Sequence, residues 1–116
     1  MNIAYCYPLA EGEILHAEHK SWPLFRVTIH GSDIERIKLS KRLSCAIKHL
    51  PLRLQVHYEK DTMKSIQEGI AKDPTLTLNG KILLEGLVSA EEITKTFENL
   101  LKEVIYYGSN HRQKGG

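Results

Sequence analysis

The residue types that carry redox chemistry are scarce in this chain. The 116 residues include only two cysteines, Cys6 and Cys45. Their separation gives neither the close pair used in dithiol exchange nor the spacing of a zinc site. We therefore expect two small, packed free thiols. A Cys6–Cys45 disulfide and a single peroxide-sensing thiol are the alternatives.

Histidines and carboxylates are the second group of chemically capable residues. Glu13, His16 and His19 are spaced three apart, so on a helix they would share a face and could bind a divalent metal. No further residue supplies a fixed fourth ligand, and we expect neither a metal nor a cofactor. His30 and Asp33 flank the end of a predicted strand. They could hydrogen-bond each other or an anionic ligand at a helix start.

The first segment that positions these residues is a predicted strand over residues 24–30, in which apolar and polar residues alternate and β-branched types are common. An S-x-x-E capping box at Ser32 predicts a helix, and Pro51 ends it. Residues 52–59 alternate between apolar and polar and predict a half-buried strand. The helix between these strands has an apolar stripe of Leu39, Leu43, Ala46, Ile47 and Leu50.

A shorter helix is predicted after Asp61 or Thr62, either of which can cap it. Two short strands follow, over residues 75–78 and 82–85. Asn79-Gly80 joins them, a strong signal for a hairpin because both residues tolerate positive φ. The apolar face expected for the short helix consists of Met63, Ile66 and Ile70.

The last helix begins at a second capping box, at Ser89, and Gly108 is its expected end. The order is therefore β-α-β-α-β-β-α, an α/β domain with a mixed four-stranded sheet and helices on both faces. We divide the chain into an N-terminal extension (1–22), the domain (23–108) and a disordered polar tail (109–116). Residues 11–19 of the extension could form one or two helical turns.

The stretch from Ile66 to Lys81, together with Leu84-Glu85-Gly86 and the helix start at Ser89, resembles the small glutaredoxin-like proteins. The resemblance implies the thioredoxin fold. It also implies that Pro74 is the cis-proline facing the active site in that fold, and that Gly86 is the glycine before the last helix.

In members of that family a Cys-x-x-Cys pair stands where the first strand meets the first helix. The helix N-terminus lowers the pKa of the first thiol, and the second thiol resolves the mixed disulfide. Here Ile34 and Ile37 occupy those positions, and no cysteine lies between Cys6 and Cys45. Dithiol oxidoreductase activity at this junction is therefore excluded.

The resemblance and the missing thiols together favour a redox-inactive module that binds a protein or peptide on the face of the lost active site. The expected binding residues are Gly31, Ser32, Asp33, Ile34, Ile37, Asp73, Pro74 and Gly86. The alternatives are a redox protein that uses Cys6 or Cys45 singly, and a small-anion site at the Ser32 helix start.

Ile34, Ile37 and Cys45 form a second apolar strip on the first predicted helix, away from its core stripe. Either the N-terminal extension covers this strip, or it is a surface for a partner or for a second copy of the chain.

The overall composition is that of an ordinary globular domain. The net charge of +2 is too small to favour nucleic-acid binding. No segment has the run of about 18 apolar residues that a membrane helix needs. The first residues lack a signal-peptide pattern, and with free thiols expected we predict a cytoplasmic location.

Overall fold

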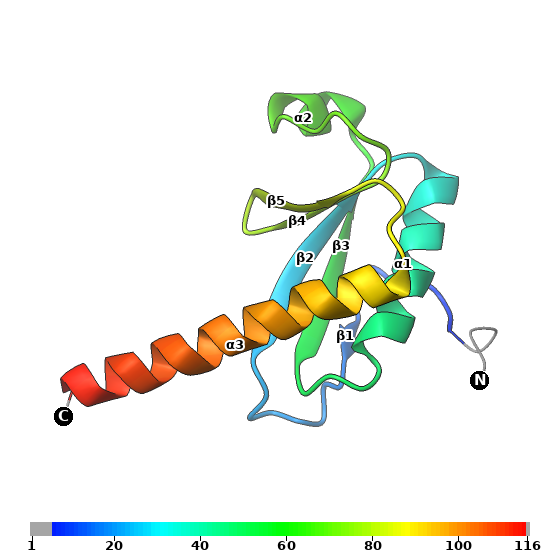
Figure 1. Cartoon of the computed structure of the whole chain (residues 1–116). Helices are drawn as coiled ribbons and strands as arrows, with labels where there is room; N and C mark the ends of the chain where they lie inside the picture. The colour runs from blue at the N-terminus through cyan, green and yellow to red at the C-terminus, as the bar shows by residue number, and fades with distance from the viewer. Residues whose placement is uncertain (1–5, 116) are drawn as a thin grey trace.

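The sheet is built around β2 (Leu24–His30), in which buried residues alternate with more exposed ones. β2 pairs parallel with β3 (Arg53–Glu59) on one side and antiparallel with β4 (Thr75–Leu78) on the other. β1 (Ile14–Leu15) lies along the outer side of β3, and β5 (Lys81–Glu85) lies along β4. The resulting order is β1-β3-β2-β4-β5 (Figure 1).

Three helices complete the domain in this computed structural model, which describes the main chain of residues 6–115 and the side chains of residues 6–104. α1 (Asp33–Ile47) connects β2 to β3, α2 (Thr62–Gln67) connects β3 to β4, and α3 (Ala90–Gly115) follows β5. From β2 to α3 this is the predicted β-α-β-α-β-β-α order, and the α/β class is confirmed. The sheet has five strands rather than the predicted four, because β1 joins it.

The hydrophobic core lies on one face of the sheet, where α1 and α3 contact each other. Phe25 of β2 meets Phe97 of α3 edge to face, with ring centroids 5.9 Å apart. The stripe predicted for α1 is confirmed as buried, because helical spacing brings its members to one side. The fully buried aliphatic side chains of the core include Ile29, Leu39, Leu43, Ile47, Leu52, Leu54, Leu76 and Ile93.

The opposite face of the central strands is polar, because successive residues of a strand point to opposite sides of a sheet. In the registers observed, Thr28 pairs with His57 of β3 and with Thr77 of β4. α2 reaches this face at the end of β2, where Ser65 hydrogen-bonds His30. α1 and α3 thus cover the core face of the sheet, whereas α2 contacts the opposite face at the end of β2.

The last helix is longer than predicted. α3 continues through Gly108 to Gly115, so the helix end predicted at Gly108 is wrong. A single glycine within a helix costs only about 1 kcal/mol, which flanking helix-forming residues can offset. Residues 109–115 of the predicted tail continue this helix. Within the described part of the chain, no helix is long and apolar enough to cross a membrane.

The N-terminal segment forms turns and a strand, not the helical turns predicted over residues 11–19. Gly12 and His16 both have positive φ, which ends any helix between them. The outer side of β3 offers main-chain groups that need partners. Gly12 N–H donates to the Val56 carbonyl at 2.8 Å, and β1 extends this pairing along β3.

The beginning of the described chain is attached to α1. A disulfide joins Cys6 to Cys45 of α1, with their Cα atoms 5.5 Å apart, so the prediction of two free thiols is wrong. Sequence spacing could not reveal this pairing, because it depends on the return of the N-terminal segment to α1.

A hydrogen-bonded group next to the disulfide holds the segment in place. Leu9 is buried, and its N–H donates to Ser40 Oγ at 2.7 Å. The Tyr58 hydroxyl lies 2.6 Å from Ser40 Oγ and donates to the Leu9 carbonyl. Burial raises the pKa of Tyr58, which keeps this hydroxyl protonated and able to donate.

Candidate functional site

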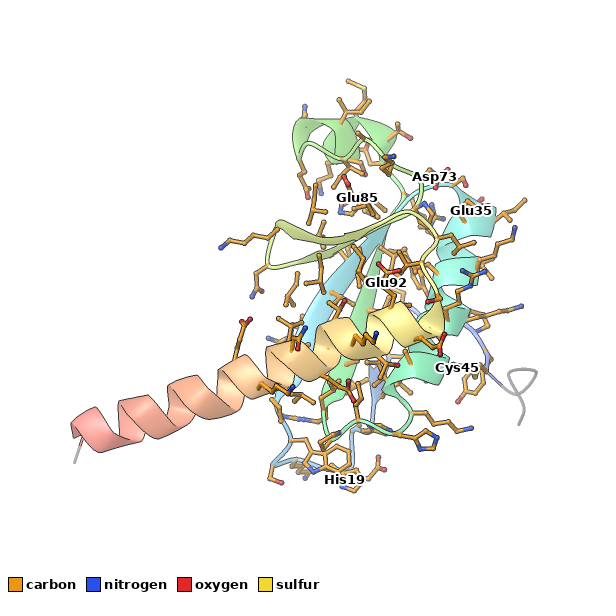
Figure 2. All side chains as sticks on the ribbon, in the orientation of Figure 1. His19, Glu35, Cys45, Asp73, Glu85 and Glu92 are labelled. Carbon is orange, nitrogen blue, oxygen red and sulfur yellow. A yellow bond between two sulfur atoms is a disulfide. The ribbon has the colours of Figure 1, made fainter. Side chains whose placement is uncertain are left out.

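The candidate site is an open cleft of about 460 Å³ between the start of α1, α2 and the turn before β4. Figure 2 shows Asp73 beside the first turn of α1, on the side of α2. Several of the lining residues are exposed, so this is a surface cleft and not an internal cavity. The lining residues include His30, Gly31, Ser32, Asp33, Arg36 and Asp73.

Gly31 forms the closest approach within the cleft. Its φ of +142° lies outside the range that other residues readily adopt. A Cβ atom on Gly31 would lie 2.2 Å from Asp73 Oδ1 and 3.1 Å from Pro74 Cα. Only glycine lets the end of β2 pass this close to the turn before β4.

The start of α1 is capped from outside the helix. Ser32 is the N-cap residue, as predicted, but its side chain makes no capping hydrogen bond. Asp73 Oδ1 instead accepts a hydrogen bond of 3.0 Å from the Ser32 N–H. The partial positive charge of a helix N-terminus favours a carboxylate at this place. Asp73 therefore supplies the negative charge that a bound anion would otherwise bring.

Arg36 is buried in the wall of the cleft and was not singled out from the sequence. Its guanidinium donates to the Gly31 carbonyl and forms an ion pair with Asp33. The i, i+3 spacing of Asp33 and Arg36 was the available signal, but such pairs are common on solvated helices. Burial of the arginine could not be recognised without the fold.

His30 lies at the base of the cleft and is buried. Its Nδ1 is 2.7 Å from Ser65 Oγ, its Nε2 is 3.3 Å from Thr77 Oγ1, and Nε2 lies 3.8 Å from Glu68 Oε1. Burial lowers the pKa of His30, while Glu68 and Glu59 act in the opposite direction. The suggested contact between His30 and Asp33 is not observed, because Asp33 pairs with Arg36.

α2 forms one wall of the cleft with little apolar burial of its own. Asp61 caps it by accepting from the N–H groups of Met63 and Lys64, as predicted for this position. The predicted buried face is wrong, because Met63 and Ile66 are 63% and 59% exposed. Ser65 is the buried residue of this helix.

The predicted site residues divide into three groups. Gly31, Ser32, Asp33 and Asp73 line the cleft. Pro74 is buried behind it, where its carbonyl accepts from Gly86 N–H at 2.7 Å. The Asp73–Pro74 peptide bond is cis, as the resemblance implies.

Ile34 and Ile37 are the third group and lie beside the cleft, not in it. They are 66% and 46% exposed, whereas Cys45 further along α1 is bound to Cys6. The described part of the N-terminal extension therefore covers the Cys45 end of the apolar strip and leaves its isoleucine end open. No residue from 6 to 22 lines the cleft.

The other candidate sites lose their geometric basis. His16 Nδ1 is 2.9 Å from the Leu52 carbonyl, and the His19 ring stacks on Trp22 with centroids 3.8 Å apart. Glu13 is not on a shared helical face with them, since β1 and turns replace the helix. In residues 6–104 no group of three or more potential ligand side chains is placed to hold a metal ion.

Comparison with protein-family models, curated proteins and solved structures gives no match for this chain.

Proposed function

We propose that this chain is a thioredoxin-like domain without dithiol chemistry, which binds an extended segment of another protein in the cleft between α1 and α2. The observation that carries the proposal is the group of exposed apolar side chains beside this cleft. Large apolar side chains exposed together are typical of a protein-binding surface.

The thioredoxin-like part of the proposal has four supports. The element order from β2 to α3 agrees with that fold, and so does a mixed sheet with β2 at its centre. The peptide bond before Pro74 is cis, and Gly86 follows β5 as the resemblance implies.

The apolar side chains of the proposed binding surface come from the two helices that border the cleft, and one of them, Ile66, lines it. Seven large hydrophobic residues are markedly exposed in the described part of the chain, and four of them belong to the first turns of α1 or to α2. This concentration distinguishes the cleft from the rest of the surface, where such residues are scattered. The four are Ile34, Ile37, Met63 and Ile66.

The main chain beside the cleft offers a further means of binding. Among the hydrogen bonds of the described residues, none uses the main-chain N–H or carbonyl of Asp73. A segment lying in extended conformation beside a chain with unused main-chain groups can pair with it as a strand would. Such pairing would hold a partner while the apolar side chains select its sequence.

The alternative functions have weaker support. Both cysteines lie in one disulfide, so neither is a free thiol for single-cysteine chemistry. The helix start at Ser32 already receives the Asp73 carboxylate, which would repel a second anion at that place.

Selection from a library of extended peptides tests the binding proposal. We expect selected peptides to bind the unmodified protein at least about tenfold more tightly than an Ile34→Ser/Ile66→Ser variant, because each buried apolar side chain contributes about 1.5–3 kcal/mol. An Ile82→Ser/Val104→Ser variant, altered at exposed apolar residues away from the cleft, is the matched control. Equal affinity for all three proteins would contradict the proposal.

An insulin-reduction assay tests the absence of dithiol chemistry. We expect no reduction above the background given by the reductant alone, since no Cys-x-x-Cys pair is present. The Cys6→Ser/Cys45→Ser variant should give the same result. Activity in the unmodified protein that this variant loses would overturn this part of the proposal.

A further inference from the structure

We infer that the segment bound in the cleft is acidic, with Asp or Glu side chains that meet Lys60 and Lys72. This inference rests on the proposed function, since it specifies the chemistry of the partner for the same cleft. It follows from which charged groups of the cleft are already paired within the domain.

The carboxylates that line the cleft all have partners. Asp33 is paired with the buried Arg36, and Asp73 accepts from the Ser32 N–H. Glu59 accepts from the Asp61 N–H at 3.2 Å and lies 3.9 Å from Lys64 Nζ. Each carboxylate of the cleft is therefore already engaged by a group of the domain itself.

Two lysines of the cleft have no such partner within hydrogen-bond or ion-pair distance in the described residues. Lys60, just after β3, and Lys72, just before Asp73, both line the cleft and are exposed. Within the described residues neither has an ion pair or a side-chain hydrogen bond, whereas the third cation, Arg36, is paired. Lys60 and Lys72 are consequently the charged side chains of the cleft that remain available to an incoming carboxylate.

The same surface favours a protein segment over a free anion. Ile66 lines the cleft together with the two lysines, and Ile34 is exposed at the start of α1. Both offer apolar contacts that a small ion would not use. A segment in which apolar residues alternate with carboxylates presents the two kinds of side chain on opposite sides when extended. Lysines at the border of such a surface act mainly on partner choice and on the rate of association.

Direct binding of three synthetic peptides tests the inference. Each is acetylated and amidated and alternates leucine with one polar residue, which is glutamate, glutamine or lysine. We expect the glutamate peptide to bind about five- to tenfold more tightly than the glutamine peptide, as two exposed charge pairs allow, and the lysine peptide to bind most weakly. Fluorescence anisotropy at low and high salt measures this, and salt should reduce the difference.

Two double variants locate the effect. Lys60→Gln/Lys72→Gln should weaken binding of the glutamate peptide about fivefold and leave binding of the glutamine peptide unchanged. Lys41→Gln/Lys95→Gln makes the same change in net charge at exposed lysines outside the cleft, and should change neither affinity.

The outcomes separate this inference from the proposed function. Equal binding of the three peptides, lost in Ile34→Ser/Ile66→Ser, would overturn the acidic partner and leave the binding cleft in place. Preference for glutamate that persists in Lys60→Gln/Lys72→Gln would also overturn the assignment to these lysines. Failure of every peptide to bind would count against both.

Discussion

At the scale of single residues, Gly31 shows how a position in the candidate site is fixed by its backbone. Positive φ and the nearness of Asp73 and Pro74 both require the absence of a side chain. Gly31 was expected in the site because of where it falls in the resemblance. The close approach that explains it is visible only in the folded chain.

Gly31→Ala should destabilise the domain by about 1–3 kcal/mol, the range for a residue forced into such a conformation. The new methyl group would also displace Asp73 from the Ser32 N–H, because 2.2 Å is far below contact distance. Chemical denaturation measures the change. Gly69→Ala is the control, since Gly69 has positive φ but open space around its Cβ position. Equal losses of stability in the two variants would show that the close approach of Gly31 to Asp73 adds nothing to the cost of the substitution.

His30 gives the domain a stability that depends on pH. Burial lowers its pKa in the folded state below the ordinary value of 6.5, whereas the unfolded chain retains that value. As the pH falls from the unfolded-state pKa of 6.5 toward the lower pKa of the folded state, the unfolded chain binds the proton more readily. The free energy of unfolding therefore decreases over this range. For Glu11, desolvation raises the pKa, but its hydrogen bonds and the nearby positive charges outweigh this and lower the pKa below 4.5. The stability that Glu11 contributes is therefore lost only at a more acidic pH.

Urea unfolding between about pH 7.5 and pH 5.5 should therefore show a smaller loss of stability in His30→Gln than in the unmodified protein. His49→Gln, at an exposed histidine, should retain the loss seen without substitution. Parallel pH profiles for His30→Gln and the unmodified protein would contradict this assignment.

The site residues that could be predicted from the sequence differ from Arg36, which could not, in the local signals that mark them. Gly31, Ser32, Asp33 and Asp73 stand at element ends, which turn and capping signals locate. Arg36 lines the same cleft and makes its polar contacts with Gly31 and Asp33, which are close to it in the sequence. Its type and spacing suggested a solvated helix face, because its burial depends on how α1 packs in the folded chain.

At the scale of secondary-structure elements, α2 is the unusual one because a polar contact attaches it to the sheet. Within residues 6–104, the hydrogen bond between Ser65 and His30 is the only side-chain hydrogen bond that joins this helix to a strand. The apolar residues predicted to hold the helix, Met63 and Ile66, point into solvent. A periodic apolar pattern cannot distinguish a face packed on the core from one left for a partner.

Ser65→Ala should loosen α2 without unfolding the domain. Losing a buried hydrogen bond and leaving His30 Nδ1 without its partner costs about 1–3 kcal/mol. Faster hydrogen exchange over residues 62–70, with unchanged exchange in β2, is the expected result. Ser32→Ala is the control, since the Ser32 side chain makes no capping bond. Unchanged exchange over α2 would show that other contacts hold the helix.

The remaining elements were predictable because local signals and tertiary packing agree for them. Apart from the C-terminal end of α3, caps, breakers and the Asn79-Gly80 turn predicted the limits of these helices and strands to within a few residues. The N-terminal segment was not predictable in this way. Its conformation depends on pairing with β3, more than 35 residues further along the chain.

At the scale of the whole molecule, the Cys6–Cys45 disulfide joins the ends of a long loop. The two cysteines are separated by 39 positions, and closing a loop of this length stabilises a protein by about 4 kcal/mol in the chain-entropy model. The prediction of a cytoplasmic location rested partly on unpaired thiols, and the disulfide removes that support. The location itself stays a prediction.

Reduction of the disulfide should lower the thermal midpoint of the unmodified protein. The Cys6→Ser/Cys45→Ser variant should unfold at a lower temperature from the start and should not respond to the reductant. Differential scanning calorimetry with and without a dithiol measures both effects. A midpoint that the reductant leaves unchanged in the unmodified protein would contradict a stabilising bond.

The attachment of the N-terminal segment to β3 has a consequence for self-association. An unpaired outer strand is a template on which further chains can add. Glu11 accepts from the Tyr58 N–H and Gly12 donates to Val56, so these groups of β3 are already occupied. A chain lacking residues 1–15 and carrying Cys45→Ser should therefore aggregate in light-scattering measurements where the full chain does not. By pairing with the outer side of β3, the N-terminal segment blocks the addition of further strands at this edge of the sheet.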